Sequence, residues 1–456
     1  MFKKIARSLW GEFESYQELK KFGMLASILF CIIGAFWAMK PTKDSIFAVL
    51  VGIDYLPLAK IVSSLFTIPL LMIYTKLVDL FKREQLFYLI IGFYALLSFV
   101  FYYFLSHPYY GIENDSASFG RLLGWIWYLY VDSFVSLALL MFWSIVVDTT
   151  KPDSAKRGFP IILLFGQMGT IAGPFFLRAS RFGFVTSAPI IIMVGCVIAL
   201  IGVLMRVFMK TTPKYLLQGY EEEKTEEEVI NKEKKKTGFL EGIRLIFKNW
   251  YLLGIVAIIG IYEATVAIID FHFHIMVKMA YPQEAANAEY LAQFGVWIGI
   301  VVVASILFGV SSIQRWFGMK ISLLVMPILV AIGIVILKIN PILSVVTLVM
   351  VFIKATSYAL NVPSMKQLYI PTTKAVRYKA QGWIDMFGLR SAKSLGGIFN
   401  LSRVLLKYQY GALAGIQVFL TIGVIFSLSM ISCWILIVLF VAKIYDRAIK
   451  KGEVVC

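Results

Sequence analysis

Charged residues stand inside stretches of this sequence that are otherwise apolar. They comprise the cations Lys40, Lys43, Lys60, Lys354, Arg390 and Lys393 and the acids Asp44, Asp132, Glu263, Asp270 and Asp385. A charge at the centre of a lipid bilayer costs at least about 2.5 kcal/mol on insertion scales, and such residues usually mark a substrate or ion pathway. Pairing between facing helices is a purely structural alternative for any single residue. As a set, however, these residues predict a binding site.

The spacing of the cations suggests which ligand they bind. Arg390 and Lys393 are three residues apart and therefore share a helix face. Gly396 and Gly397 follow them and would let a neighbouring helix approach closely. Arginine offers a two-pronged donor to phosphate and lysine a mobile point charge. The pattern therefore favours a polyanionic cargo.

We expect Lys60, Lys393, Arg390, Lys354 and Lys43 to surround the phosphates of that cargo in one central cavity. We also expect these cations to be short of carboxylate partners until the phosphates bind. The acids Asp132, Asp270 and Asp385 are expected to balance charge, with Asp132 and Asp270 holding the cations apart and neutralised when the site is empty.

The elements that position these charges are transmembrane helices. The chain has 456 residues, of which 59% are hydrophobic and only 16% charged, with a mean hydropathy of +0.80. Apolar runs long enough to cross a hydrocarbon layer of roughly 30 Å recur along it. The predicted spans are 23–41, 53–76, 85–106, 121–147, 159–180, 186–208, 250–275, 291–314, 319–338, 341–362, 383–406 and 413–443. The predicted fold is an all-α polytopic membrane protein with about twelve transmembrane helices.

The loops divide the chain and orient it. We expect an amphipathic cytoplasmic N-terminus (1–22), a six-helix half (23–208), a charged cytoplasmic connector (209–249), a second six-helix half (250–443) and a cytoplasmic tail (444–456). Lys and Arg are concentrated in the loops that this arrangement places in the cytoplasm. That asymmetry explains the net charge of +17 without nucleic-acid binding. The four cysteines have neither disulfide nor metal-site spacing, and we expect no metal or cofactor.

Two sets of matching residues relate the halves. Thr149-Thr150-Lys151, Lys156 and Gly173 recur 223 residues later as Thr372-Thr373-Lys374, Lys379 and Gly396. A second echo links Ile32-Ile33-Gly34 and Asp44 to Ile258-Ile259-Gly260 and Asp270. Together they favour a duplication. Two related six-helix halves joined by a long cytoplasmic connector resemble transporters of the major facilitator type, whose substrate site is expected near the membrane midplane.

Longer segments resemble one family in particular. The most specific are KATSYALNVPSMKQLYIPTT (354–373) and KAQGWIDMFGLRSAKSLGG (379–397). Supporting matches, in family order, are TKDSIF (42–47), LAKIVSSLFTIPLLMIYTKL (58–77), FWSIVVDTTKPDSAKRGFP (142–160) and YPQEAANAEYLAQFGVWIGI (281–300). These segments resemble the nucleotide transporters, the ATP/ADP translocases of obligate intracellular bacteria and plastids.

The resemblance implies exchange of ATP for ADP and phosphate, or import of other nucleotides, across a bacterial inner membrane or plastid envelope. We expect the cell inner membrane, with both termini in the cytoplasm. The resemblance also implies transport roles for Lys60, Asp132, Asp270 and Lys393. The family pattern has glutamate at the positions of Asp132 and Asp270. Aspartate has the same charge on a side chain that is one methylene shorter. Gln381 replaces a second family lysine near Lys379. Substrate identity and coupling are therefore open, and a monomer is compatible with the sequence.

Aromatic residues would recognise the base of a nucleotide. The candidates are Trp37, Tyr128, Tyr262 and Phe271, although lipid contact or packing is an alternative for each. A proton- or phosphate-coupled importer of other nucleotides or organic phosphates is the main alternative function, with Asp132 or Asp270 carrying the proton. An intramembrane enzyme or lipid-handling protein is the less favoured alternative, because it predicts polar residues clustered near one membrane interface, whereas here they spread over six spans. The absence of a P-loop motif argues against ATP hydrolysis by the protein itself.

Overall fold

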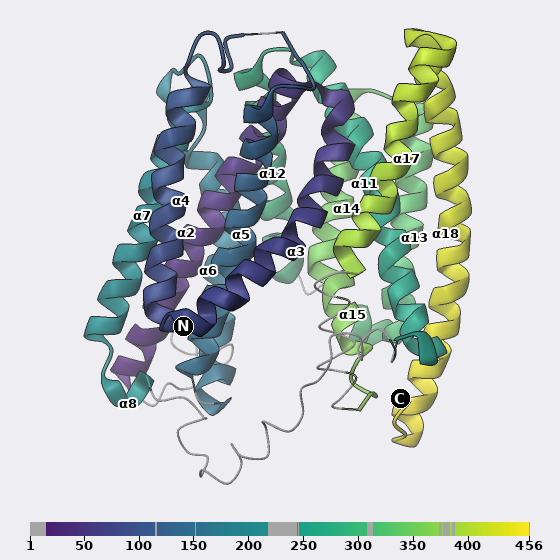
Figure 1. Ribbon diagram of the computed structural model, residues 1–456. Helices are drawn as coiled ribbons and strands as arrows, with labels where there is room; N and C mark the ends of the chain where they lie inside the picture. The colour runs from purple at the N-terminus through teal and green to yellow at the C-terminus, as the bar shows by residue number, and fades with distance from the viewer. Residues whose placement is uncertain are drawn as a thin grey trace. The chain divides into compact units, whose positions relative to one another are not determined.

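A computed structural model of the protein describes residues 15–114, 116–150, 152–217, 244, 246–307, 313–373, 376, 384 and 388–455. The regular structure of this part of the chain is entirely helical (Figure 1). The first set of long helices is α2 (Tyr16–Phe47), α3 (Leu56–Leu80), α4 (Arg83–Leu105), α5 (Leu122–Asp148), α6 (Pro152–Phe176) and α7 (Ala188–Thr211). The second set is α11 (Trp250–Ala280), α12 (Glu284–Leu307), α13 (Ile313–Ile339), α14 (Leu343–Thr356), α17 (Leu389–Tyr410) and α18 (Ala412–Lys451).

Short elements connect these helices. They are the π-helical turns η1 (Ala48–Gly52) and η6 (Ser357–Asn361), the 3₁₀ turns η2 (Ile53–Tyr55) and η3 (Ala179–Phe182), and the helices α8 (Lys214–Leu217) and α15 (Val362–Gln367). The predicted span 341–362 is therefore not one regular helix. Pro363 follows η6 and has no N–H to donate, so a regular α-helical ladder cannot continue through it.

Ten helical stretches within the described ranges are long and apolar enough to cross a membrane. The first of them, Tyr16–Val78, contains α2 and all but the last two residues of α3. Helix α17 is not among the ten, and it carries four cations along its length. When α2 and α3 are counted separately and α17 is included, the described helices correspond one to one with the predicted spans.

Four helices begin six or seven residues earlier than the sequence predicts. Two of them are α6, at Pro152 rather than 159, and α13, at Ile313 rather than 319. Helix α2 begins at Tyr16 rather than at 23, and the Ser15 side chain caps it by accepting a hydrogen bond from the Glu18 N–H at 3.1 Å. Helix α12 begins at Glu284 rather than at 291. The Glu284 carboxylate is buried and accepts hydrogen bonds from the Ser45 hydroxyl at 2.8 Å and the Ser187 N–H at 2.9 Å. Pairing of this kind lets polar residues enter a packed helix.

The chain forms two compact units. Unit 1 comprises residues 1–52, 65–235 and 281–299, and unit 2 comprises 53–64, 236–280 and 300–456. Helices α3 and α12 each begin in one unit and end in the other. The units therefore do not coincide with the predicted halves 23–208 and 250–443, which remain a prediction about the duplication. Most of the connector 209–249 lies outside the described residues.

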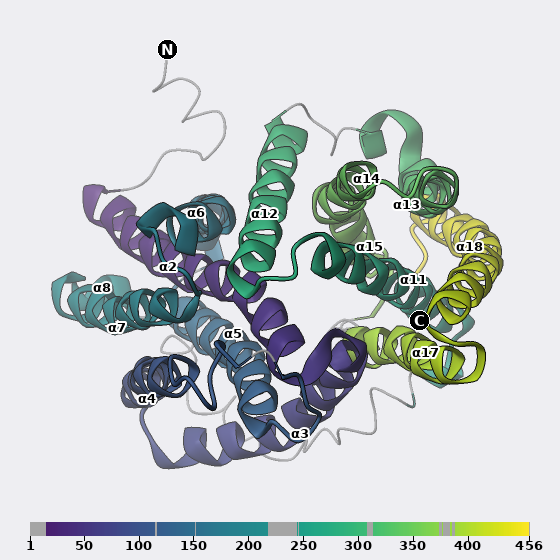
Figure 2. The same ribbon diagram turned by 90° about the horizontal axis from the view of Figure 1, so that it is seen from above.

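Each unit repeats the same helix packing. In unit 1, α2 packs against α5, α6 and α7, and α4 packs against α7. In unit 2, α11 packs against α14, α17 and α18, and α13 packs against α18 (Figure 2). By order along the chain these are equivalent pairs, first with fourth, fifth and sixth, and third with sixth. Equivalent packing is what a duplicated ancestor predicts.

Two repeated glycines hold equivalent helices close together. A Cβ atom on Gly173 of α6 would collide with the Gly34 carbonyl oxygen of α2. A Cβ atom on Gly396 of α17 would lie 2.6 Å from the Ala264 carbonyl oxygen of α11. Only glycine permits such contact between helix backbones. The first and fifth helices of each set therefore meet at the positions that the 223-residue repeat singled out.

Candidate functional site

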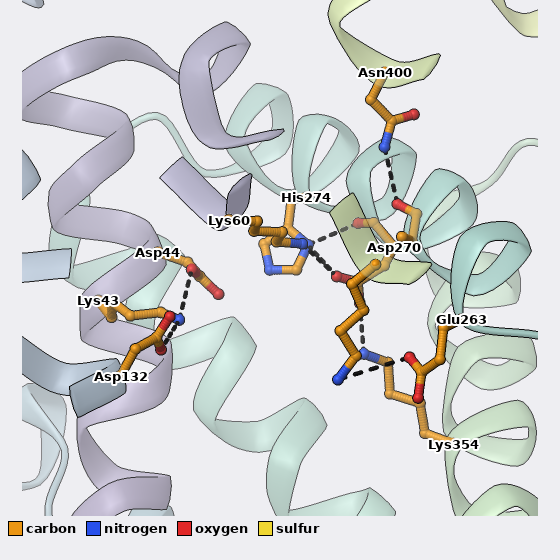
Figure 3. Close-up of polar contacts among 11 residues, drawn as sticks. Lys43, Asp44, Lys60, Asp132, Glu263, Asp270, His274, Lys354 and Asn400 are labelled. Carbon is orange, nitrogen blue, oxygen red and sulfur yellow. Dashed lines mark hydrogen bonds and ion pairs between the residues drawn. The ribbon is translucent and has the colours of Figure 1, made fainter. Parts of the chain in front are cut away.

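Asp270 in α11 forms ion pairs with two lysines that lie on other helices in unit 2 (Figure 3). Lys60 of α3 donates to one carboxylate oxygen at 2.9 Å, and Lys354 of α14 donates to the other at 2.5 Å. All three side chains are largely withdrawn from solvent, with 12% of Asp270, 25% of Lys60 and 17% of Lys354 exposed. His274 lies one turn along α11, where its Nδ1 is 2.7 Å from the Asp270 carbonyl oxygen.

A second ion pair lies on the same face of α11. Glu263 precedes Asp270 by seven residues, which places both acids on one helix face. The ammonium group of Lys393 in α17 lies 3.6 Å from the Glu263 carboxylate, and 56% of the Lys393 side chain is exposed. Two turns further along α17, the Asn400 amide donates to the Ala267 carbonyl oxygen at 3.0 Å. The close contact at Gly396 and this hydrogen bond fix the register that brings Lys393 to Glu263.

Unit 1 contains its own buried charge cluster. Lys43 of α2 donates to Asp132 of α5 at 2.7 Å and lies 3.8 Å from Asp44. Its ammonium group also stands over the Tyr128 ring, 4.0 Å from the ring centre. Only 9% of the Lys43 side chain is exposed, against 30% of Asp132. Carboxylates and an aromatic face thus compensate the charge that burial would otherwise penalise.

The expectation that the cations are short of carboxylate partners is wrong for the four whose side chains are described. Lys43, Lys60, Lys354 and Lys393 each face a carboxylate in this structure. For Lys43, Lys60 and Lys354, burial explains the difference, because an unpaired lysine in a low-dielectric interior costs several kcal/mol more than a paired one. The geometry does place Asp132 and Asp270 where they neutralise lysines. Their transport roles remain a prediction, since ion pairs can also serve packing alone.

Two predicted site residues cannot be placed. Asp385 lies outside the described residues, and so does the side chain of Arg390, whose backbone belongs to the first turn of α17. The pairing of Arg390 with Lys393 around phosphate is therefore untested. Among the described residues, no group of three or more His, Cys, Asp or Glu side chains could hold a metal ion.

The predicted base-stacking residues are mostly covered. Tyr128 and Phe271 are each 1% exposed, so neither ring offers a face to a base in this conformation. Trp37 is 9% exposed, and Lys40 stands 4.2 Å from the centre of its ring. Tyr262 is half-buried, and its hydroxyl donates to the Ser357 hydroxyl at 2.6 Å.

Sequence reasoning missed two features of unit 2. Glu263 stood among the intramembrane charges, yet its pairing with Lys393 was not predicted. Asp54 in η2 accepts hydrogen bonds from both Arg403 and Lys407 of α17. The four-residue spacing of Arg403 and Lys407 signals a shared helix face. Nothing in the sequence identifies a partner about 350 residues away.

Comparison with known proteins identifies relatives along the whole length. The profile of a family described as TLC ATP/ADP transporter matches residues 1–445. ADP,ATP carrier protein 1 of Rickettsia prowazekii is 26% identical over 99% of this chain and 98% of its own length. ADP,ATP carrier protein 3 of the same organism is 26% identical over 88% of this chain and 89% of its own.

Solved structures share the fold at low sequence identity. The nucleoside transporter NupG aligns with a TM-score of 0.59 at 14% identity, covering 93% of this chain and 99% of its own. A bacterial homologue of the human lysosomal transporter Spinster aligns at 0.56 and 13% identity, covering 96% of this chain and 98% of its own. The predicted fold, a polytopic helical protein of the major-facilitator-like type, is thereby confirmed.

Proposed function

Because this chain belongs to the TLC ATP/ADP transporter family, we propose that it exchanges ATP for ADP across a membrane by alternating access. It is a multi-pass membrane protein, with ten apolar helical stretches in the described ranges. The names of its relatives describe carriers of ADP and ATP, which supports these two nucleotides as substrates. An antiporter moves its substrates unchanged, so no catalytic residue is required.

The observation that carries the proposal is the sharing of Asp270 between Lys60 and Lys354. A nucleotide phosphate presents several anionic oxygens, and lysine binds such oxygens through charge-assisted hydrogen bonds. We propose that the phosphates take the place of the Asp270 carboxylate on these two lysines. Lys393 contributes a third cation, and its exposed side chain makes it the most accessible of the three.

The replacement of Asp270 by phosphate on the two lysines accounts for exchange rather than one-way transport. When the phosphates leave, Asp270 again satisfies the two lysines, so the empty site is a stable resting state. In the empty protein, the ion pairs of Asp270 with Lys60 and Lys354 must stay intact while the protein reorients. In the loaded protein, the nucleotide phosphates have replaced Asp270 and these ion pairs are broken. Coupling of this kind favours transport only when a nucleotide travels in each direction.

We further propose that the protein works as a monomer in lipid, in the cell inner membrane, with both termini in the cytoplasm. The concentration of Lys and Arg in the N-terminal segment, the connector 209–249 and the alternate loops supports that orientation. Phosphate is proposed as a further substrate, because the same lysines would bind it.

Counterflow into proteoliposomes tests the function directly. Purified protein is reconstituted into vesicles preloaded with ATP, ADP, GTP, UTP or buffer, and uptake of labelled ATP and ADP is measured. We expect uptake only into vesicles that contain ATP or ADP. Uptake into buffer-loaded vesicles that follows an imposed pH gradient would instead identify the proton-coupled importer, and would overturn the exchange mechanism.

A further inference from the structure

The π-helical turn η6 interrupts the tenth helix directly beside the lysines on Asp270. It begins at Ser357, three residues after Lys354, and ends at Asn361. Turns of this kind inside α-helices are rare and are frequent at functional sites. The side chain of Asn361 is 5% exposed, and its oxygen has no hydrogen-bond partner among the described residues. A buried acceptor without a partner is costly, and a bound ligand is one source of the missing donor.

Helix α11 holds this turn in place. The Tyr262 hydroxyl donates to Ser357 at 2.6 Å, and the Tyr262 ring packs against Trp434 with 5.9 Å between ring centres. The next residue of α11, Glu263, pairs with Lys393. One turn of α11 thus positions both η6 and Lys393, the most accessible of the three lysines proposed to bind the phosphates.

Tyr358 is the exposed aromatic residue of this turn. It follows Lys354 by four residues, so the two side chains share a helix face about 6 Å apart along the axis. Tyr358 is 46% exposed, and its phenol lies in the neighbourhood of the Lys393 ammonium. Tyr358 thus stands beside the lysines that are proposed to hold the phosphates.

We propose that the Tyr358 ring stacks on the base of the transported nucleotide. This inference rests on the proposed function, in which Lys60, Lys354 and Lys393 hold the phosphates. Tyr262 acts as a positioning residue, because it fixes the turn without offering its own face to the base. Stacking tolerates any base, since every base has a π face. The turn therefore supplies affinity for the nucleoside end of the substrate, separately from the phosphates.

Binding to purified protein separates the two ends of the ligand. Calorimetry with ATP and with inorganic tripolyphosphate, which has no base, is carried out on Tyr358→Leu, Tyr358→Trp and the wild type. Phe352→Leu is the matched control, because Phe352 is 47% exposed on α14 and lies on a different face from Tyr358. Loss of base stacking is expected to weaken ATP binding roughly 5- to 150-fold in Tyr358→Leu. Tripolyphosphate binding stays unchanged, and Tyr358→Trp and Phe352→Leu bind ATP like the wild type.

Two results would overturn the inference while leaving the exchange function intact. One is wild-type ATP affinity in Tyr358→Leu. The other is an equal loss of ATP and tripolyphosphate affinity, which would assign Tyr358 a role in folding or in phosphate binding. If Tyr358→Leu does not fold, weakened ATP binding by Tyr358→Trp with normal tripolyphosphate binding would likewise contradict stacking. Absence of ATP/ADP counterflow by the wild type is a separate result and would reject the proposed function itself.

Discussion

A single residue, Asp270, pairs with two lysines of unit 2, Lys60 and Lys354. It lies on one face of α11 with Glu263, and between them these acids meet lysines from α3, α14 and α17. Their positions could be predicted, because charged residues inside apolar spans are conspicuous in a sequence. The partner of each could not, since Lys60 and Asp270 are 210 residues apart and only the fold brings them together.

Removing the Asp270 charge should destabilise the protein and stop exchange. In Asp270→Asn, Lys60 and Lys354 lose the anion that compensates their burial, and breaking a buried ion pair costs about 3–5 kcal/mol. We expect a lower thermal unfolding midpoint and no ATP/ADP counterflow. Asp270→Glu keeps the charge and introduces the residue of the family pattern, so it should retain exchange.

Glu453→Gln is the control for this pair of variants. Glu453 and Lys451 form an exposed ion pair, with 60% and 59% of their side chains accessible, and pairs of that kind contribute little to stability. Its unfolding midpoint and exchange rate should match those of the wild type. An Asp270→Asn protein that exchanges nucleotides normally would show that the carboxylate is dispensable.

Helices are positioned by contacts that the sequence predicts only in part. Long apolar runs predicted the spans, and the 223-residue repeat drew attention to Gly173 and Gly396. The early starts of α2 and α12 were missed because their first turns carry polar residues, such as Glu18 and Glu284, that are buried through hydrogen bonds or ion pairs. The π turn at Ser357–Asn361 was missed because apolar periodicity does not distinguish it from an α-helix.

The repeated glycines should be far less tolerant of a methyl group than helical glycines that have open space beside them. Gly173→Ala and Gly396→Ala push a Cβ atom into a neighbouring backbone carbonyl, so the first and fifth helices of each set must separate. We expect a lower thermal unfolding midpoint for both. Gly92→Ala and Gly260→Ala are the matched controls, because nothing lies within 4 Å of an added Cβ there.

For these controls, alanine is the better helix former by about 1 kcal/mol, so they should be neutral or slightly stabilising. Equal unfolding midpoints for all four variants would refute the close packing of α2 on α6 and of α11 on α17.

The whole molecule is where sequence prediction succeeded most. The all-helical membrane fold follows from composition, and the equivalent packing of the two helix sets follows from the repeat. The bounds of the compact units could not be predicted from the sequence. Residues 53–64 group with the second unit and residues 281–299 with the first. Such an exchange depends on contacts that hydropathy does not encode.

Orientation in the membrane can be tested with single cysteines. After the four native cysteines are replaced by serine, Tyr109→Cys and Tyr215→Cys are each probed with a membrane-impermeant maleimide on intact cells. Both tyrosines are well exposed, at 69% and 57%. With cytoplasmic termini, the first variant should react in intact cells and the second only after permeabilisation. The reverse pattern would invert the proposed orientation.

The central claim is that phosphates replace Asp270 on Lys60 and Lys354. Calorimetric binding of ATP to the purified wild type and to Lys60→Gln, Lys354→Gln and Lys338→Gln tests it most directly, with Lys338 as an exposed lysine on α13 that lies outside the site. Loss of one charge-assisted contact, worth about 1.5–3 kcal/mol, should weaken ATP binding at least roughly tenfold in each of the first two variants. Lys338→Gln should bind normally. Wild-type affinity in both Lys60→Gln and Lys354→Gln would contradict the account.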